Sequence, residues 1–298
     1  MMDAKMLDKI SSAPGFIAAL DQSGGSTPGA LRLYGVSESD YQGDEEMFRL
    51  MHAMRVRIMS APAFTGDKVV GAILFERTMD GDVEGQPVPS YLWEKRGVVP
   101  FLKVDKGLEA EQNGVQVMKP MPELDALLIR GREKGIFGTK MRSVIASADK
   151  AGIAAVVKQQ FEVARQIIGQ GLMPIIEPEV SIKSPTKGEA EAILRDELAQ
   201  HLDKLPASET VMLKLTIPTT ADFYAPLVAH KSVVRLVALS GGYSRQEACE
   251  KLKHNHGMIA SFSRALTENL RVTMSDDEFN ASLAETIDEI YAASVNKA

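Results

Sequence analysis

A lysine stands in the middle of a largely apolar run, residues 211–217, which read Val-Met-Leu-Lys-Leu-Thr-Ile. A run of this kind predicts a buried strand. Burial disfavours the charged form of an amine and can lower its pKa by several units. A neutral amine is a nucleophile towards carbonyl carbons. The pattern therefore has two interpretations: Lys214 is a nucleophile, or it snorkels to solvent or pairs with a carboxylate.

The elements that must position Lys214 are visible as eight short apolar runs, most of them followed by a helical pattern. These predicted strands cover residues 15–21, 69–75, 98–105, 135–142, 171–179, 210–217, 233–240 and 257–263. Alternation of strands and amphipathic helices indicates parallel pairing, and eight units predict a (β/α)8 TIM barrel. An open doubly wound sheet is the alternative, but no Gly-x-Gly-x-x-Gly follows an early strand.

Helical and loop patterns complete this picture. An apolar stripe from Ile153 to Ile168 predicts one helix, and a polar helical pattern covers about residues 187–204. The capping-box sequence at residues 275–278 predicts a C-terminal helix over about 276–295, which includes Tyr291. Residues 34–44 are acidic and turn-rich, so we expect an exposed loop there. No linker divides the chain, and we expect one domain over residues 1–298.

Charged side chains gather inside these strands or at their C-terminal ends, the catalytic end of such barrels. They are Asp21, Lys103, Asp105, Lys140, Arg142, Glu177, Glu179, Lys214 and Arg264. Alternate residues of a strand share a face, which directs Lys214 into the barrel and Leu213 and Leu215 towards the helices. Five cations against four carboxylates make the site net positive in a chain of net charge −6. We therefore expect an anionic substrate.

Phosphate is the anion that the loops favour. Ser240, Gly241 and Gly242 follow the seventh strand and precede a helix, where backbone N–H groups can approach an anion closely. Residues 261–264, with Ser261, Ser263 and Arg264, close the eighth strand. The loops after the last two strands are the usual phosphate site of such barrels.

This set of residues suits Schiff-base chemistry. A cationic neighbour, of which Lys140 is the nearest candidate, pushes a lysine towards its neutral form. The iminium formed on Lys214 would draw electrons from an adjacent carbon–carbon bond. Asp21, Glu177 and Glu179 are carboxylates that could move the protons. The alternative for Glu177 and Glu179 is that they only neutralise Lys140 and Lys214.

Composition excludes several other classes of protein. The chain is 45% hydrophobic and 25% charged, as ordinary globular proteins are. It has no Lys/Arg cluster typical of nucleic-acid binding and no run long enough to span a membrane. The histidines do not cluster with carboxylates or cysteines, so we expect no metal centre. One cysteine, Cys249, excludes an internal disulfide and fits a cytoplasmic protein.

Seven segments together resemble the class I fructose-1,6-bisphosphate aldolases, in particular their bacterial branch. They are residues 18–23 (Ala-Ala-Leu-Asp-Gln-Ser), 99–107 (Val-Pro-Phe-Leu-Lys-Val-Asp-Lys-Gly), 140–142 (Lys-Met-Arg), 174–179 (Pro-Ile-Ile-Glu-Pro-Glu), 213–214 (Leu-Lys), 239–242 (Leu-Ser-Gly-Gly) and 261–264 (Ser-Phe-Ser-Arg). They occur in the family's order and with comparable spacing. The Lys-Val-Asp-Lys-Gly and Glu-Pro-Glu motifs are the specific ones.

The resemblance implies a metal-independent enzyme of glycolysis and gluconeogenesis without a cofactor. It would reversibly split fructose 1,6-bisphosphate into dihydroxyacetone phosphate and glyceraldehyde 3-phosphate. It also implies roles for individual residues. Lys214 would form the Schiff base, with Glu177 as its acid/base, Glu179 in support of Glu177, and Lys140 as the electrostatic neighbour. Asp21 would handle the proton of the hydroxyl next to the cleaved bond. One phosphate would be held by Ser240, Gly241 and Arg264 with the backbone at Ser263, and the other would lie near Lys103, Ser23 and Ser26.

Two other functions remain open on the sequence alone. The chain could be a Schiff-base aldolase for another sugar phosphate, which would differ at the second phosphate. It could also be an inactive barrel that serves as a scaffold, although no reactive group is replaced by an inert residue. A homo-oligomer is possible in either case, because members of the family often assemble.

Overall fold

Eight parallel strands form a closed barrel in the computed structural model, which describes residues 2–298. They are β1 (Phe16–Leu20), β2 (Val69–Leu74), β5 (Val99–Lys103), β7 (Gly138–Ile145), β8 (Met173–Val180), β9 (Val211–Thr216), β10 (Val233–Leu239) and β11 (Met258–Phe262). Pairing of β1 with β11 and of β5 with β7 closes the sheet. Each predicted strand is present, so the predicted (β/α)8 barrel is confirmed.

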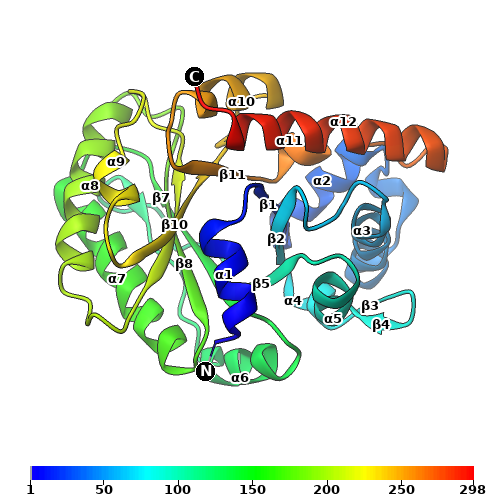
Figure 1. Ribbon diagram of the computed structural model, residues 1–298, viewed down its shortest axis with the longest axis horizontal. Coiled ribbons are helices and arrows are strands. Elements are labelled where there is room, and N and C mark those ends of the chain that lie inside the picture. The colour runs from blue at the N-terminus through cyan, green and yellow to red at the C-terminus, as the bar shows by residue number, and fades with distance from the viewer. Residues whose placement is uncertain (1) are drawn as a thin grey trace.

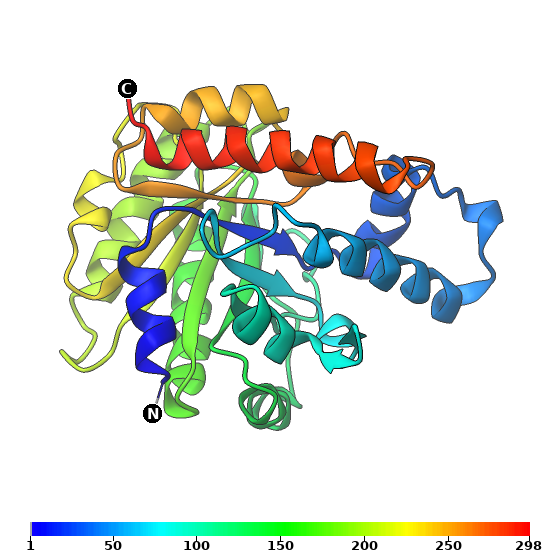
Figure 2. The same ribbon diagram turned by 45° about the vertical axis from the view of Figure 1, so that its right-hand side comes forward.

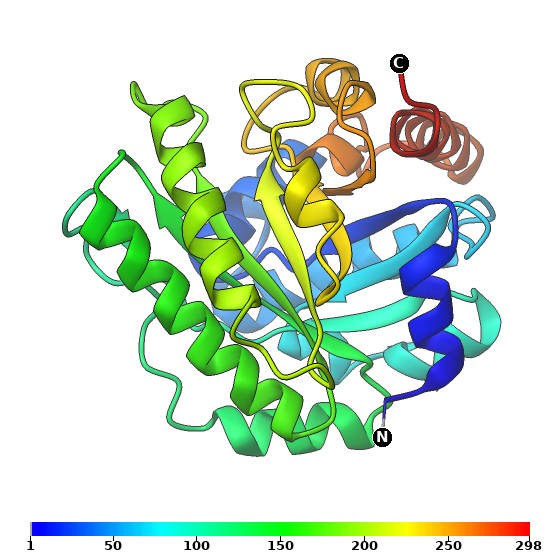
Figure 3. The same cartoon turned by 60° about the vertical axis from the view of Figure 1, so that its left-hand side comes forward.

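Helices follow the strands and cover the outside of the barrel (Figures 1 and 3). They are α2 (Thr27–Tyr34) and α3 (Gly43–Ser60) after β1, α4 (Glu76–Met79) and α5 (Val88–Ser90) after β2, α6 (Leu124–Glu133) after β5, α7 (Lys150–Gly169) after β7, α8 (Lys187–Leu202) after β8, α9 (Ala225–Val228) after β9, α10 (Arg245–Lys253) after β10, and α11 (Arg264–Thr267) and α12 (Asp276–Val295) after β11. Three short strands, β3 (Asp82–Val83), β4 (Gln86–Pro87) and β6 (Val115–Gln116), lie in the loops.

Strand alternation divides the core into an inner and an outer cluster. On β9, Met212 packs inside the barrel, where Ile175 and Val237 also lie. Leu213 and Leu215 belong to the cluster between the barrel and its helices. The predicted orientation of β9 is therefore confirmed, and Lys214 shares the inner face with Met212.

Helix α1 (Ala4–Ser12) covers the N-terminal end of the barrel and stands in front of the strands in Figure 1. Its Ile10 packs in the inner cluster. Arg235, near the start of β10, donates hydrogen bonds to the main-chain oxygens of Ile10 and Ala13. Because a helix closes this end, the open mouth of the barrel is the opposite end, where the charged residues lie.

The segment from residue 34 to 44 is not the wholly exposed loop that its composition predicts. Tyr34 and Val36 are buried, and a short 3-10 helix spans Glu38–Asp40. The Tyr34 ring packs edge-on against Phe279 of α12, with ring centroids 6.5 Å apart. The prediction was wrong for Tyr34 and Val36. The burial of Tyr34 depends on its contact with a helix more than 230 residues away in the chain.

The C-terminal helix α12 lies beside α10 and over β11 (Figure 2). The Ser275 side chain accepts a hydrogen bond from the Glu278 amide, and the Glu278 side chain accepts one from the Ser275 amide. This is the predicted capping box. The half-buried Tyr291 packs against the outer cluster from within α12.

Removing this cap should weaken the attachment of α12. We expect Ser275→Ala to lower the free energy of unfolding by about 1 kcal/mol, because an N-terminal amide of the helix loses its acceptor. Urea unfolding followed by circular dichroism measures the change. Ser282→Ala, in the middle of the same helix, is the matched control and should leave the midpoint nearly unchanged. Equal midpoints for both variants would contradict a stabilising cap.

Candidate active site

The Glu177 carboxylate lies between two lysines at the mouth of the barrel. Its Oε1 is 3.0 Å from Lys214 Nζ, and its Oε2 is 2.9 Å from Lys140 Nζ. The contact with Lys140 is an ion pair without hydrogen-bond geometry. The lysine side chains are only 5% and 3% exposed, respectively. One carboxylate therefore pairs with two buried lysines.

Two further carboxylates complete the surroundings of Lys140. Asp21 Oδ2 is 2.9 Å from Lys140 Nζ, and Asp105 Oδ2 is 3.7 Å from it. Asp105 also accepts from Lys103 Nζ at 2.6 Å, through its Oδ1. The cluster is thus a chain of alternating charges, with Lys140 at its centre.

Strand register brings these residues together. Lys103 on β5 is paired with Lys140 on β7, and Arg142 on β7 is paired with Glu177 on β8. Asp21 follows the last residue of β1, so it also lies at the C-terminal end of the barrel. Because inward-facing residues of adjacent strands meet at the same level, side chains from β1, β5, β7, β8 and β9 converge on one site.

Asp21 and Lys140 favour their charged forms despite their burial. Desolvation opposes ionisation of Asp21, but Lys140, Lys214 and Lys103 outweigh it and hold the pKa of Asp21 well below its usual range. Desolvation likewise opposes the charge on Lys140, yet Asp21, Glu177 and Asp105 raise the pKa of this lysine above its usual value. The surrounding carboxylates therefore favour the charged form of Lys140.

Glu179 does not contact Lys140 or Lys214. Its Oε2 is 2.6 Å from Arg142 Nε, nearer the solvent than the Glu177 pairs. The alternative in which Glu179 merely neutralises one of these two lysines is therefore wrong, since its partner is an arginine. The two glutamates share the inward face of β8, as predicted, but they have different partners.

The loop after β10 and the residues after β11 meet, as their predicted common role requires. Gly241 and Gly242 have φ angles of 61° and 114°, which a side chain disfavours. A Cβ on Gly242 would lie 3.1 Å from Arg264 Nη2. Ser240 is buried, and so is Ser261, whose Oγ has no hydrogen-bond partner within residues 2–298. This site offers backbone amides, hydroxyls and a guanidinium.

Ser23 and Ser26 lie in a short 3-10 turn after β1. Ser26 Oγ donates to the Ser23 main-chain oxygen and accepts from the Ser23 amide. Lys103, predicted to lie near these serines at a second phosphate, instead donates to Asp105. No hydrogen bond or ion pair in the described part of the chain joins Lys103 to either serine.

Arg55 is a buried cation that the sequence interpretation missed. It lies on α3 and is 2% exposed. Burial lowers the pKa of Arg55 to about 10, while the negative charge of Asp21 acts in the opposite direction. The signal was present in the sequence, because Arg55 follows Met47 and Met51 on the buried face of an amphipathic helix.

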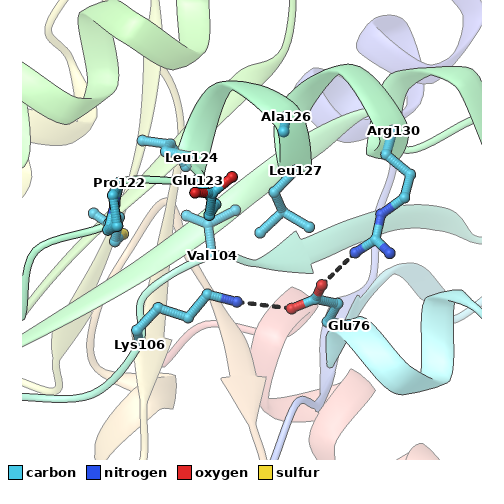
Figure 4. A pocket seen from close by; sticks show the side chains of 10 residues that line it. Glu76, Val104, Lys106, Pro122, Glu123, Leu124, Ala126, Leu127 and Arg130 are labelled. Carbon is cyan, nitrogen blue, oxygen red and sulfur yellow. Dashed lines mark hydrogen bonds and ion pairs between the residues drawn. The ribbon is translucent and has the colours of Figure 1, made fainter.

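A cavity of about 490 Å³ is lined by residues of α6, by Glu76 of α4 and by two residues that follow β5. Val104 forms part of its wall, and Lys106 Nζ lies 2.7 Å from a Glu76 oxygen (Figure 4). None of Asp21, Lys103, Asp105, Lys140, Glu177 and Lys214 lines this cavity. Within residues 2–298, no helix is long and apolar enough to cross a membrane.

Comparison with known proteins decides the family. The family model for class I fructose-bisphosphate aldolase matches residues 9–217, which is more than half of the chain. The chain belongs to the class I fructose-bisphosphate aldolase family. It is 57% identical over 291 residues to the class 1 fructose-bisphosphate aldolase of Synechocystis sp., and the match covers 98% of this chain and 97% of the relative.

A solved structure supports the fold. The fructose-bisphosphate aldolase of Plasmodium falciparum, crystallised with TRAP and a small-molecule inhibitor, matches with a TM-score of 0.74 at 19% identity. The match covers 99% of this chain and 96% of the other. The family membership makes this class I aldolase a lyase that reversibly cleaves fructose 1,6-bisphosphate to dihydroxyacetone phosphate and glyceraldehyde 3-phosphate through a lysine Schiff base.

Removing the central cation should destabilise the protein in a pH-dependent way. We expect Lys140→Met to cost about 3–5 kcal/mol at neutral pH, because buried carboxylates lose their partner. The low pKa of Asp21 stabilises the parent above about pH 3.8, and this contribution is lost as the pH falls below that value. The difference between the two proteins should therefore shrink on acidification.

Thermal melts across the acidic pH range measure this difference. Lys158→Met is the matched control, since Lys158 forms only an exposed pair with Glu162 on α7. We expect it to change stability by less than about 1 kcal/mol at every pH. A penalty for Lys140→Met that is constant with pH would contradict the electrostatic explanation.

Proposed function

We propose that Lys214 is the Schiff-base lysine and that Glu177 is its proton partner. The 3.0 Å separation of Lys214 Nζ and Glu177 Oε1 carries this proposal. Transfer of one proton from the ammonium to the carboxylate would produce a neutral amine and a neutral acid together. The amine then adds to the ketone carbon of the substrate, and the resulting carbinolamine has a hydroxyl that must leave.

Glu177 completes the formation of the iminium in this proposal. Its proton passes to the carbinolamine hydroxyl, which departs as water while the nitrogen lone pair forms the C=N bond. Lys140 remains charged beside it, because the Asp21 and Asp105 carboxylates lie 2.9 and 3.7 Å from its Nζ and stabilise the ammonium. The charge of Lys140 then lies next to the Glu177 carboxyl group that moves the proton.

Asp21 is the proposed base for the bond cleavage. It takes the proton from the hydroxyl next to the cleaved carbon–carbon bond, and the electron pair of that bond moves to the iminium. An aldehyde leaves and an enamine remains. Protonation of the enamine and addition of water then release the ketone phosphate and regenerate Lys214. The low pKa of Asp21 keeps it ionised throughout the neutral range.

The remaining residues would bind and orient the anionic substrate. Ser240, Gly241, Gly242, Ser261, Ser263 and Arg264 form the proposed site for one phosphate, and Lys103, Arg142, Ser23 and Ser26 are the candidates for the other end. Glu179 would act indirectly, since it holds Arg142. We further propose that the reaction uses no metal or cofactor. Assembly as a homo-oligomer and a cytoplasmic location remain predictions.

Trapping the intermediate tests the role of Lys214. Borohydride added with dihydroxyacetone phosphate should inactivate the enzyme and attach the reduced adduct to Lys214, because hydride reduces an iminium to a stable amine. Peptide mass spectrometry locates the adduct, and Lys214→Arg should remain unlabelled. Full activity after this treatment, together with loss of activity in a chelator, would refute the metal-free Schiff-base mechanism.

Truncation of Arg264 tests the proposed phosphate site. Arg264→Ala should raise KM for fructose 1,6-bisphosphate on the order of 10–100-fold, since it removes charge-assisted hydrogen bonds. The value of kcat should change much less, because the phosphate is bound equally in the ground and transition states. Steady-state cleavage assays separate the two constants, and Arg195→Ala, at a half-buried site on α8, should have the KM of the parent enzyme. A parental KM in Arg264→Ala would refute this assignment.

A further inference from the structure

The guanidinium of Arg55 is directed at the loop after β1. Its Nη2 donates to the main-chain oxygen of Gln22 at 2.5 Å and lies 3.3 Å from Gln22 Oε1. Its Nη1 donates to Thr78 Oγ1 at 2.7 Å, on α4 after β2. Arg55 thus connects the segments that follow two adjacent barrel strands.

Stability alone does not account for this arginine. A buried charge is costly unless a counter-charge compensates it. Arg55 forms no ion pair with a carboxylate among residues 2–298, and its Nε lacks a hydrogen-bond partner there. An apolar residue of similar volume would satisfy the packing of α3 without this desolvation cost. We therefore attribute the position of Arg55 to the segments that its N–H groups bind, at Gln22 and Thr78.

The segment that Arg55 holds contacts the proposed phosphate site. The Nε2 of Gln22 donates to Ser263 Oγ at 2.6 Å. Ser263 is the N-cap residue of α11, and Arg264 is the first residue of that helix. The Gln22 amide is oriented because Arg55 binds its Oε1, which leaves Nε2 facing Ser263. One relay of hydrogen bonds therefore runs from Thr78 through Arg55 and Gln22 to the residue before Arg264.

We propose that Arg55 is a positioning residue that sets the place of Arg264 through Gln22 and Ser263, and so tunes the affinity for the substrate phosphate. This inference rests on the proposed phosphate role of Arg264. Arg55 is too buried to touch the substrate itself. Small displacements of a guanidinium are costly for phosphate binding because the hydrogen bonds are directional.

The test compares variants at two points of the relay. Arg55→Met removes the donors, and Gln22→Met removes the bond to Ser263 while leaving its main-chain oxygen available to Arg55. Both should raise KM for fructose 1,6-bisphosphate on the order of 10-fold, with kcat nearly unchanged. Their combination should be no worse than either alone, because they interrupt one pathway. Arg55→Lys, which retains a charged donor, should recover part of the loss.

Arg57→Gln is the matched control, on the same helix but bonded to Met274 and Asp276. It should lower the melting temperature and leave KM unchanged, which separates a purely structural effect from a positioning effect. A parental KM in Gln22→Met overturns the proposal, and this variant remains informative should Arg55→Met fail to fold. If Arg264→Ala raises KM but Gln22→Met does not, the positioning role alone fails. A parental KM in Arg264→Ala overturns both assignments.

Discussion

The position of Glu177 between Lys140 and Lys214 is the constraint on which the site depends. Three ionisable groups are buried there, and none could remain charged alone in that environment. Lys140 is paired with Asp21, Asp105 and Glu177, and Glu177 also pairs with Lys214. In the proposed mechanism, the same pairing places the nucleophile beside its acid.

The barrel provides the rigidity that this arrangement needs. Each member of the cluster is on a strand or at its end, and each strand is paired on both sides. Apolar residues such as Met212 fill the inner face below the charges, and α1 closes the other end. Water therefore reaches the charged groups from one direction, through the mouth where a phosphorylated sugar would enter.

The proposed phosphate site differs from the charged cluster in the part of the fold that carries it. Gly241, Gly242 and Arg264 lie in segments after the strands, and such segments need support from elsewhere to hold a fixed geometry. Arg55 and Gln22 provide that support from a helix outside the barrel and from the loop after β1. Charge thus has different surroundings in the two places: in the cluster the buried charges pair with one another, and under the loops the Arg55 guanidinium donates to neutral oxygens.

The sequence by itself determined the eight strands, the inward direction of Lys214, and the convergence of Asp21, Lys140 and Glu177, because strand periodicity and the position of a residue along its strand are local properties. Only the tertiary structure decided which charges pair. Glu179 binds Arg142, and Lys103 binds Asp105, because partner choice depends on the stagger of adjacent strands. Burial of Tyr34 and the contact of Arg55 with Gln22 depend on helix packing between distant segments, which no local pattern specifies.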